Sequence, residues 1–129
     1  LVGGGSGLVP LMAMVRRRAQ AGTRAPMHLL LSARTLQDVL FYEELSELGR
    51  RGDGFGFTLA LTRAQPRRAQ DFARRIDDAI MAEVLGRVPE WPKRVFICGT
   101  NGFVNVAADG AQAAGVAADI IRTERYGGL

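Results

Sequence analysis

Cysteine, histidine and lysine each occur only once among the 129 residues, as Cys98, His28 and Lys93. A single cysteine excludes an intrachain disulfide, and one cysteine with one histidine argues against a zinc site built from these ligands. We therefore expect no metal site. A reducing compartment is also indicated, and the cytoplasm is the simplest candidate.

Long apolar runs and aromatic residues are scarce as well. No apolar run reaches the roughly 18 residues of a membrane helix. The apolar segment 1–14 has no basic region before it, so it does not resemble a signal peptide. Only 7% of the residues are aromatic, and no basic run is interleaved with aromatics, which disfavours nucleic-acid binding. The net charge of +4 comes almost entirely from arginine; it indicates either codon bias or a phosphate-binding surface.

Apolar segments of strand length alternate with segments of helical character along the chain. Strands are predicted at residues 1–2, 27–33, 55–62, 94–99 and 116–123. Helices are predicted at residues 10–20, 36–49, 71–85 and 102–114. Apolar strands that alternate with helices are typical of a parallel sheet covered on both faces. The sequence therefore predicts one α/β domain over residues 1–129.

Ligands of such sheets bind at the carboxyl ends of the strands, where the strand order reverses. The loops expected there are residues 3–10, 33–38, 62–68 and 99–103. The first strand has only two residues before the glycines, so we expect the natural polypeptide to extend upstream.

The first of these loops carries the strongest local signal. Glycines allow the backbone to approach a pyrophosphate closely, and the following helix N-terminus offers free N–H groups and a favourable dipole. Pro10 stands where the common dinucleotide motif has its third glycine. The alternative is a glycine-rich turn that binds nothing. The candidate binding residues are Gly4, Gly5, Ser6, Gly7, Leu8 and Pro10.

The loops after the second and third strands carry hydroxyl groups and arginines. Ser32 and Arg34 end the second strand, and no acidic residue precedes Asp38 to take ribose hydroxyls, which favours a 2′-phosphate. Thr62 and Arg63 end the third strand. A hydroxyl beside a guanidinium can hold a phosphate dianion, although a solvated arginine loop is the alternative.

The fourth strand ends at Cys98 and Gly99, followed by Thr100 and Phe103. Cys98 would lie near the ligand crevice, although a lone buried cysteine is more often a small apolar residue. A Cys–His nucleophile is disfavoured because His28 is remote in sequence. No lysine follows the glycine loop, which disfavours a kinase.

Together these segments resemble the C-terminal NAD(P)-binding domain of the ferredoxin–NADP reductase-like flavoproteins. The resemblance rests on the glycine loop through Pro10, on Ser32 to Arg34, on Thr62-Arg63, on Cys98 to Phe103, on the helix 38–45, and on the ending 124–128. It covers essentially the whole chain. It implies a three-layer Rossmann-like fold whose five parallel strands lie in the order 3-2-1-4-5.

The resemblance also implies roles for individual residues. The glycine loop would hold the pyrophosphate, and Thr62 with Arg63 would bind the NADP 2′-phosphate, assisted by Arg68. Cys98 and Gly99 would lie beside the nicotinamide. Tyr126 would approach the flavin or nicotinamide, with Glu124 nearby, so the resemblance makes Cys98, Glu124 and Tyr126 the candidate catalytic residues. Thr62 stands where serine is commoner, so NADP or NAD remains open.

Members of this family carry FAD or FMN on an N-terminal β-barrel, which these residues do not contain. The resemblance therefore implies an oxidoreductase domain that positions NAD(P)H for hydride transfer to a flavin of the same polypeptide. Electrons would pass on to a ferredoxin or another iron–sulfur or haem partner, and the chain alone would be inactive. The alternative is a nucleotide-binding regulatory module without redox chemistry.

Overall fold

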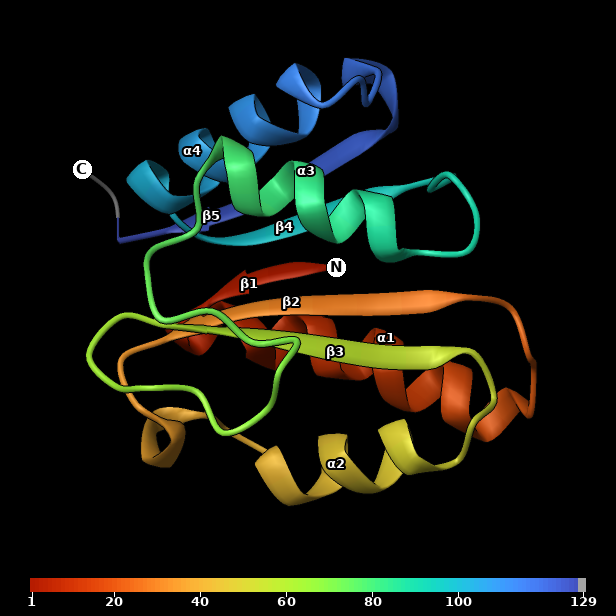
Figure 1. Cartoon of the computed structure of the whole chain (residues 1–129). Helices are drawn as coiled ribbons and strands as arrows, with labels where there is room; N and C mark the ends of the chain where they lie inside the picture. Colours follow the sequence, from red (N-terminus) through yellow and green to blue (C-terminus); the bar gives the residue numbers. More distant parts are fainter. Residues whose placement is uncertain (128–129) are drawn as a thin grey trace.

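The computed structural model describes residues 1–127 as a three-layer α/β domain (Figure 1). The strands are β1 (Val2–Gly4), β2 (Met27–Ala33), β3 (Phe55–Leu61), β4 (Val95–Thr100) and β5 (Ile121–Tyr126). The α-helices are α1 (Leu8–Ala21), α2 (Tyr42–Arg50), α3 (Asp78–Arg87) and α4 (Asn101–Ala113). Single 3₁₀ turns, η1 (Gly5–Gly7), η2 (Leu36–Asp38) and η3 (Ala118–Ile120), precede α1, α2 and β5.

All five strands are parallel and lie in the order β3-β2-β1-β4-β5, which confirms the expected topology. Helices α1 and α2 cover one face of the sheet, and α3 and α4 cover the other (Figure 1). Each face has its own apolar core, in which successive strand residues alternate: Leu29 and Leu31 face α1 and α2, whereas Leu30 faces α3. Both faces of the central strands are thereby removed from water, as their unbroken apolar sequences require.

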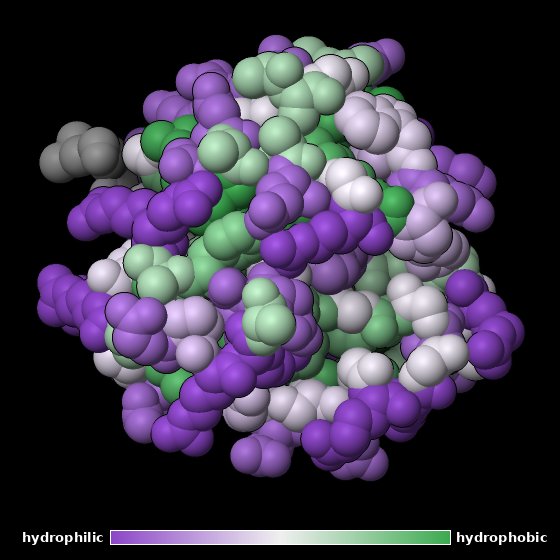
Figure 2. Space-filling view, viewed as in Figure 1, coloured by the Kyte–Doolittle hydropathy of each residue, from purple (hydrophilic) through white to green (hydrophobic). Residues whose placement is uncertain are grey.

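The carboxyl ends of the strands meet at one edge of the sheet, on the left in Figure 1. The loops that follow β1, β2, β3 and β4 therefore gather at this edge. In the view of Figure 2, hydrophilic side chains project from the same side of the molecule. Among residues 1–127, every helix is too short or too polar to cross a lipid bilayer.

The predicted bounds of the first two helices need correction. Helix α1 begins at Leu8, two residues before Pro10, so the proline occupies its third position. Its missing N–H is harmless there, because the first-turn N–H groups have no partner within the helix. The predicted helix 36–49 is interrupted: Thr35 and Asp38 form a capping box around η2, and Phe41 adopts a left-handed conformation, with φ of 60°, just before α2.

The predicted helix 71–85 is wrong over its first seven residues. Phe72 pairs with the outer edge of β3, where its N–H donates to the Leu59 carbonyl and its carbonyl accepts from the Leu61 N–H, each at 2.8 Å. Helix α3 starts only at Asp78, and the Asp77 carboxylate caps it by accepting from the Ile80 N–H. The sheet edge gains hydrogen bonds from this segment, and that gain outweighs the helical spacing of its apolar residues.

The predicted strand 116–123 also needs correction. Residues Ala118–Ile120 form η3, and β5 runs over Ile121–Tyr126. This edge strand is exposed along nearly its whole length. Its sequence therefore has no run of apolar residues that could mark its bounds. The remaining predicted elements agree with the structure to within one residue at each end, apart from β1, which extends to Gly4.

Candidate functional site

A cleft of roughly 840 Å³ opens at the carboxyl edge of the sheet. All four loops that follow β1 to β4 contribute to it. Of the predicted binding residues, the cleft is lined by Gly5, Ser32, Arg34, Thr62, Arg63, Thr100 and Phe103. The tertiary fold thus brings together in one space residues that are up to 98 positions apart in the sequence, from Gly5 to Phe103.

Positive charge dominates the side of the cleft formed by β2 and β3. Arg34, Arg63 and Arg75 line it, against one carboxylate, that of Asp38. This carboxylate already accepts hydrogen bonds from the N–H and hydroxyl of Thr35, at 3.2 and 2.9 Å. Within residues 1–127, none of the three arginines forms an ion pair. Exposed guanidinium groups with no carboxylate partner are available to an anionic ligand.

The backbone aligns these groups. The Thr62 N–H donates to the Ala33 carbonyl at 3.0 Å, and the Arg63 N–H donates to the Arg34 carbonyl at 2.8 Å. Backbone hydrogen bonds between the two segments therefore continue past the last strand pair, Ala33 with Leu61. As a result, Arg34 and Arg63 leave the sheet side by side.

The glycine loop forms the turn η1 between β1 and α1. Gly5 has φ of 55°, a left-handed conformation that favours glycine. Gly7 packs against the peptide group of Cys98, where a side chain would overlap the carbonyl. No side chain caps α1. The Leu8 N–H donates to the carbonyls of Gly5 and Ser6 within the turn, and Pro10 has no N–H, so only part of this helix N-terminus is left for water or a ligand. Ser6 and Pro10 are exposed near these groups, whereas Leu8 is fully buried in the core.

Cys98 is buried, with 4% of its surface exposed, and belongs to the core under α1. Burial raises the pKa of its thiol, and the neighbouring Glu124 carboxylate raises that pKa further. Glu124 lies directly opposite Cys98 in the β4–β5 register and is itself exposed. A buried thiol with a raised pKa is a weak nucleophile, which agrees with the argument against a Cys–His nucleophile.

Tyr126 ends β5 beside the glycine loop. Its hydroxyl donates to the Gly4 carbonyl at 2.9 Å, and its side chain is partly exposed. Gly99 and Thr100 lie in the neighbouring strand, and the Thr100 hydroxyl caps α4 by accepting from the Phe103 N–H. Gly128, the last residue of the segment on which the resemblance rests, lies outside the described residues.

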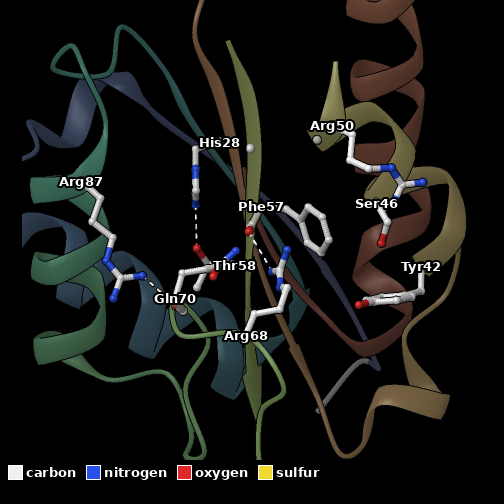
Figure 3. Close-up of a pocket in the computed structure, with 11 residues that line it drawn as sticks. His28, Tyr42, Ser46, Arg50, Phe57, Thr58, Arg68, Gln70 and Arg87 are labelled. Atoms are coloured by element: carbon white, nitrogen blue, oxygen red, sulfur yellow. Dashed lines mark hydrogen bonds between the residues drawn. The ribbon is translucent and has the colours of Figure 1, made fainter. Parts of the chain in front are cut away.

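Arg68 does not lie in this cleft. Its guanidinium contacts the ring of Phe57 at 3.9 Å from the ring centre, forms a bidentate ion pair with Asp71, and donates to the Phe57 carbonyl at 3.0 Å. Figure 3 shows it at a second hollow along β3, between side chains of α2 such as Tyr42 and the Arg87 side chain of α3. Arg68 is held there because its guanidinium donates a hydrogen bond to a main-chain carbonyl on the outer edge of β3.

Arg75 was missed by sequence reasoning, because residue 75 fell inside a predicted helix. Its apolar neighbour Ile76 and the α4 residue Val106 also line the cleft, as does Gly102. The only local signal was the pair Arg74-Arg75, which follows the 62–68 loop closely enough for both to share its edge of the sheet. That signal becomes readable only once residues 71–77 are known to lie outside the helix.

Comparison with known proteins agrees with this geometry. The family described as "Oxidoreductase NAD-binding domain" matches residues 1–109. The reductase component of propane 2-monooxygenase from Rhodococcus jostii is 29% identical over 127 residues, which cover 97% of this chain and 34% of the relative. Ferredoxin–NADP reductase B from Sorangium cellulosum is 28% identical over 125 residues, covering 95% of this chain and 51% of the relative. The chain thus spans a third to a half of the length of these relatives.

Solved structures share the fold. Flavohemoglobin from Malassezia yamatoensis, determined with bound FAD and heme, superposes with a TM-score of 0.77 at 23% identity, over 98% of this chain and 30% of that chain. The family match covers most of the chain. The chain therefore belongs to the oxidoreductase NAD-binding domain family, and the relatives it matches are reductases.

Proposed function

We propose that this domain binds NADP(H) in the carboxyl-end cleft and holds its nicotinamide for hydride transfer to a flavin on a companion domain. We favour NADP over NAD because three arginines, Arg34, Arg63 and Arg75, line the same cleft. These guanidinium groups line the cleft with Thr62, and none has a carboxylate partner among residues 1–127. A 2′-phosphate is the part of NADP that NAD lacks, and it needs such donors.

The residues present fit a dinucleotide at three further points. The uncapped N-terminus of α1 and the open backbone of Gly5 can receive a pyrophosphate. The end of β4 and the ring of Tyr126 lie next to this loop, where a nicotinamide would extend. We assign Ser32 to the ribose that carries the 2′-phosphate, since it lines the same side of the cleft.

Arg75 replaces Arg68 in this proposal as the assisting base. Arg68 is engaged on the outer edge of β3 by Asp71 and the Phe57 carbonyl, outside the residues that line the cleft. Arg75 lines the cleft and has no ion-pair partner among residues 1–127. The pairing of Phe72 with β3 keeps the segment before α3 against the edge of the sheet and out of a helix.

Bound NADPH would supply a hydride, and the protein would position the two rings and exclude water between them. We assign Cys98, Glu124 and Tyr126, on the ends of β4 and β5, to the nicotinamide end of the site, although none of them is among the residues that line the cleft. The flavin and its β-barrel domain are proposed to lie in the same polypeptide, and a ferredoxin or another iron–sulfur or haem protein is proposed as the electron acceptor. The relatives include the reductase component of an oxygenase and a ferredoxin reductase, which supports this assignment. A cytoplasmic location remains part of the proposal.

The decisive experiment is calorimetric titration of the chain with adenosine 2′,5′-bisphosphate and, separately, with AMP. Neither ligand requires the flavin. We expect the bisphosphate to bind more tightly, and Arg63→Ala or Arg75→Ala to remove much of that advantage. A charge-assisted hydrogen bond contributes about 1.5 to 3 kcal/mol, so each substitution is expected to weaken the bisphosphate roughly tenfold or more.

Arg94→Ala is the matched control, because Arg94 precedes β4 at the opposite end of the sheet and its loss changes the net charge equally. Equal binding of the two nucleotides would instead assign the cleft to NAD. The chain alone is expected to show no NADPH oxidation. Activity without an added flavoprotein would contradict the need for a companion domain.

A further inference from the structure

Two glycines at the site have ordinary backbone conformations. Gly4 has φ of −115° and ψ of 119°, which is extended backbone that any residue adopts. Gly99 also has no left-handed φ. Conformational freedom therefore does not explain why glycine occupies these two positions at the ends of β1 and β4.

The ring of Phe103 explains both glycines. A Cβ added to Gly4 would lie 2.9 Å from both Cγ and Cδ2 of Phe103. A Cβ added to Gly99 would lie 2.6 Å from Cδ1 of the same ring. The ring thus occupies the space that side chains of both residues would need, and it packs against two adjacent strand ends.

Phe103 is itself held firmly. It lies in the first turn of α4, and its N–H donates to the Thr100 hydroxyl at 3.3 Å. The next inward-facing residues of α4, Val104 and Ala107, are fully buried. On the other side of the contact, the Tyr126 hydroxyl holds the Gly4 carbonyl. Gly4 is therefore confined between an aromatic ring and a hydrogen bond immediately before the glycine loop begins.

We propose that Phe103 is a positioning residue: through its packing on Gly4 and Gly99 it sets the placement of the glycine loop, and hence of the pyrophosphate. The inference rests on the proposed nucleotide binding. Phe103 acts here through the backbone of Gly4 rather than as a binding group for the adenosine end. The side chains assigned to that end, on the loops after β2 and β3, do not depend on this contact.

The test uses Gly4→Ala, Phe103→Ala and the double variant, titrated with ADP, which carries a pyrophosphate, and with adenosine 2′-monophosphate, which does not. We expect Gly4→Ala to weaken ADP about tenfold, equivalent to about 1.4 kcal/mol, and to leave the monophosphate within about twofold, as expected for weakly coupled sites. Removal of the ring makes room for the new methyl group, so the double variant should bind ADP several-fold more tightly than Gly4→Ala.

Phe103→Leu gives a sharper comparison. Leucine keeps an atom at Cγ, where the clash with a residue-4 methyl group arises, so Gly4→Ala with Phe103→Leu should not recover ADP binding. Thermal unfolding of each variant separates loss of fold from loss of binding. If Gly4→Ala fails to fold, the two single variants of Phe103 provide the test. Phe103→Ala must weaken binding of ADP but not of the monophosphate, and Phe103→Leu must weaken ADP binding less than Phe103→Ala does.

Additive losses in the double variant, or equal losses of ADP and the monophosphate, would overturn the positioning role. Binding of neither nucleotide by the unsubstituted chain would instead defeat the proposed function, and this inference with it. Binding of both nucleotides with no effect of Gly4→Ala would defeat the inference alone.

Discussion

Gly7 provides a sharp test of how closely the glycine loop approaches β4. Its backbone, with φ of −60° and ψ of −14°, is helical and suits alanine better than glycine. By backbone conformation alone, Gly7→Ala should stabilise the protein by about 0.4 to 1 kcal/mol. Packing predicts the opposite sign. The new Cβ would lie 2.7 Å from the carbonyl carbon of Cys98, closer still to its oxygen, and 3.2 Å from the Gly99 nitrogen.

These neighbours cannot move aside cheaply. They are main-chain atoms of β4, which is hydrogen-bonded to β1 on one side and to β5 on the other. Overpacking of a rigid interior costs about 1 to 3 kcal/mol, and backbone neighbours place the cost at the upper end. After the backbone gain is subtracted, we expect a net loss of about 2 kcal/mol. For a domain of this size, that lowers Tm by roughly 5 to 8 °C.

Gly86→Ala is the matched control. Gly86 lies within α3, is exposed, and has no atom within 4 Å of an added Cβ. Alanine is favoured there by about 0.5 to 1 kcal/mol, so this variant should raise Tm by a few degrees. Urea denaturation and thermal scans at one pH measure both. A Gly7→Ala protein as stable as the unsubstituted chain would refute the close approach of the loop to Cys98.

Two further predictions concern titrating groups. Burial, reinforced by the positive charges of the Leu1 amino group, Arg87 and Arg68, lowers the pKa of His28 to about 4. Since the unfolded chain takes up this proton near pH 6.5 and the folded chain only near pH 4, the free energy of unfolding should fall by roughly 2 to 3 kcal/mol as the pH drops through that window. His28→Gln should reduce the pH dependence of the free energy of unfolding, measured by urea titrations at several pH values. An unchanged pH dependence in this variant would contradict the lowered pKa of His28. Burial and then the Glu124 carboxylate raise the pKa of the Cys98 thiol, so a chromogenic disulfide should label it slowly in the native protein and rapidly in urea; fast labelling at neutral pH without denaturant would contradict its burial.

Much of the fold was readable from local pattern. Unbroken apolar segments such as 27–33 and 55–61 identify strands buried on both faces, and the structure has them there. The glycine loop between a strand and a helix was also visible, because left-handed backbone and a close approach leave few alternatives to glycine. The strand order came from the resemblance to a family, since local sequence does not determine which strands become neighbours.

The errors arose where a long-range contact overrides a local pattern. Phe72, Ile76 and Ile80 have helical spacing, yet Phe72 is extended because the free edge of β3 offers it two backbone hydrogen bonds. Contacts with the same edge of β3 also determine which of two arginines lines the cleft. Arg68 is nearer in sequence to Thr62, but it is held by Asp71 and the Phe57 carbonyl, whereas Arg75 lines the cleft.

The sequence by itself determined that this chain is a parallel α/β domain with a glycine loop between its first strand and first helix, because strand burial, helix periodicity and glycine chemistry are properties of short segments. Only the tertiary structure decided which arginines face the cleft and why Gly4 and Gly99 are glycines. The first depends on how the edge of β3 is satisfied. The second depends on the ring of Phe103, about a hundred residues from Gly4 in the sequence. The contact of Phe103 with Gly4 joins distant segments, so no local pattern encodes it, and the contact with Gly99, four residues away, follows from the same placement of the ring.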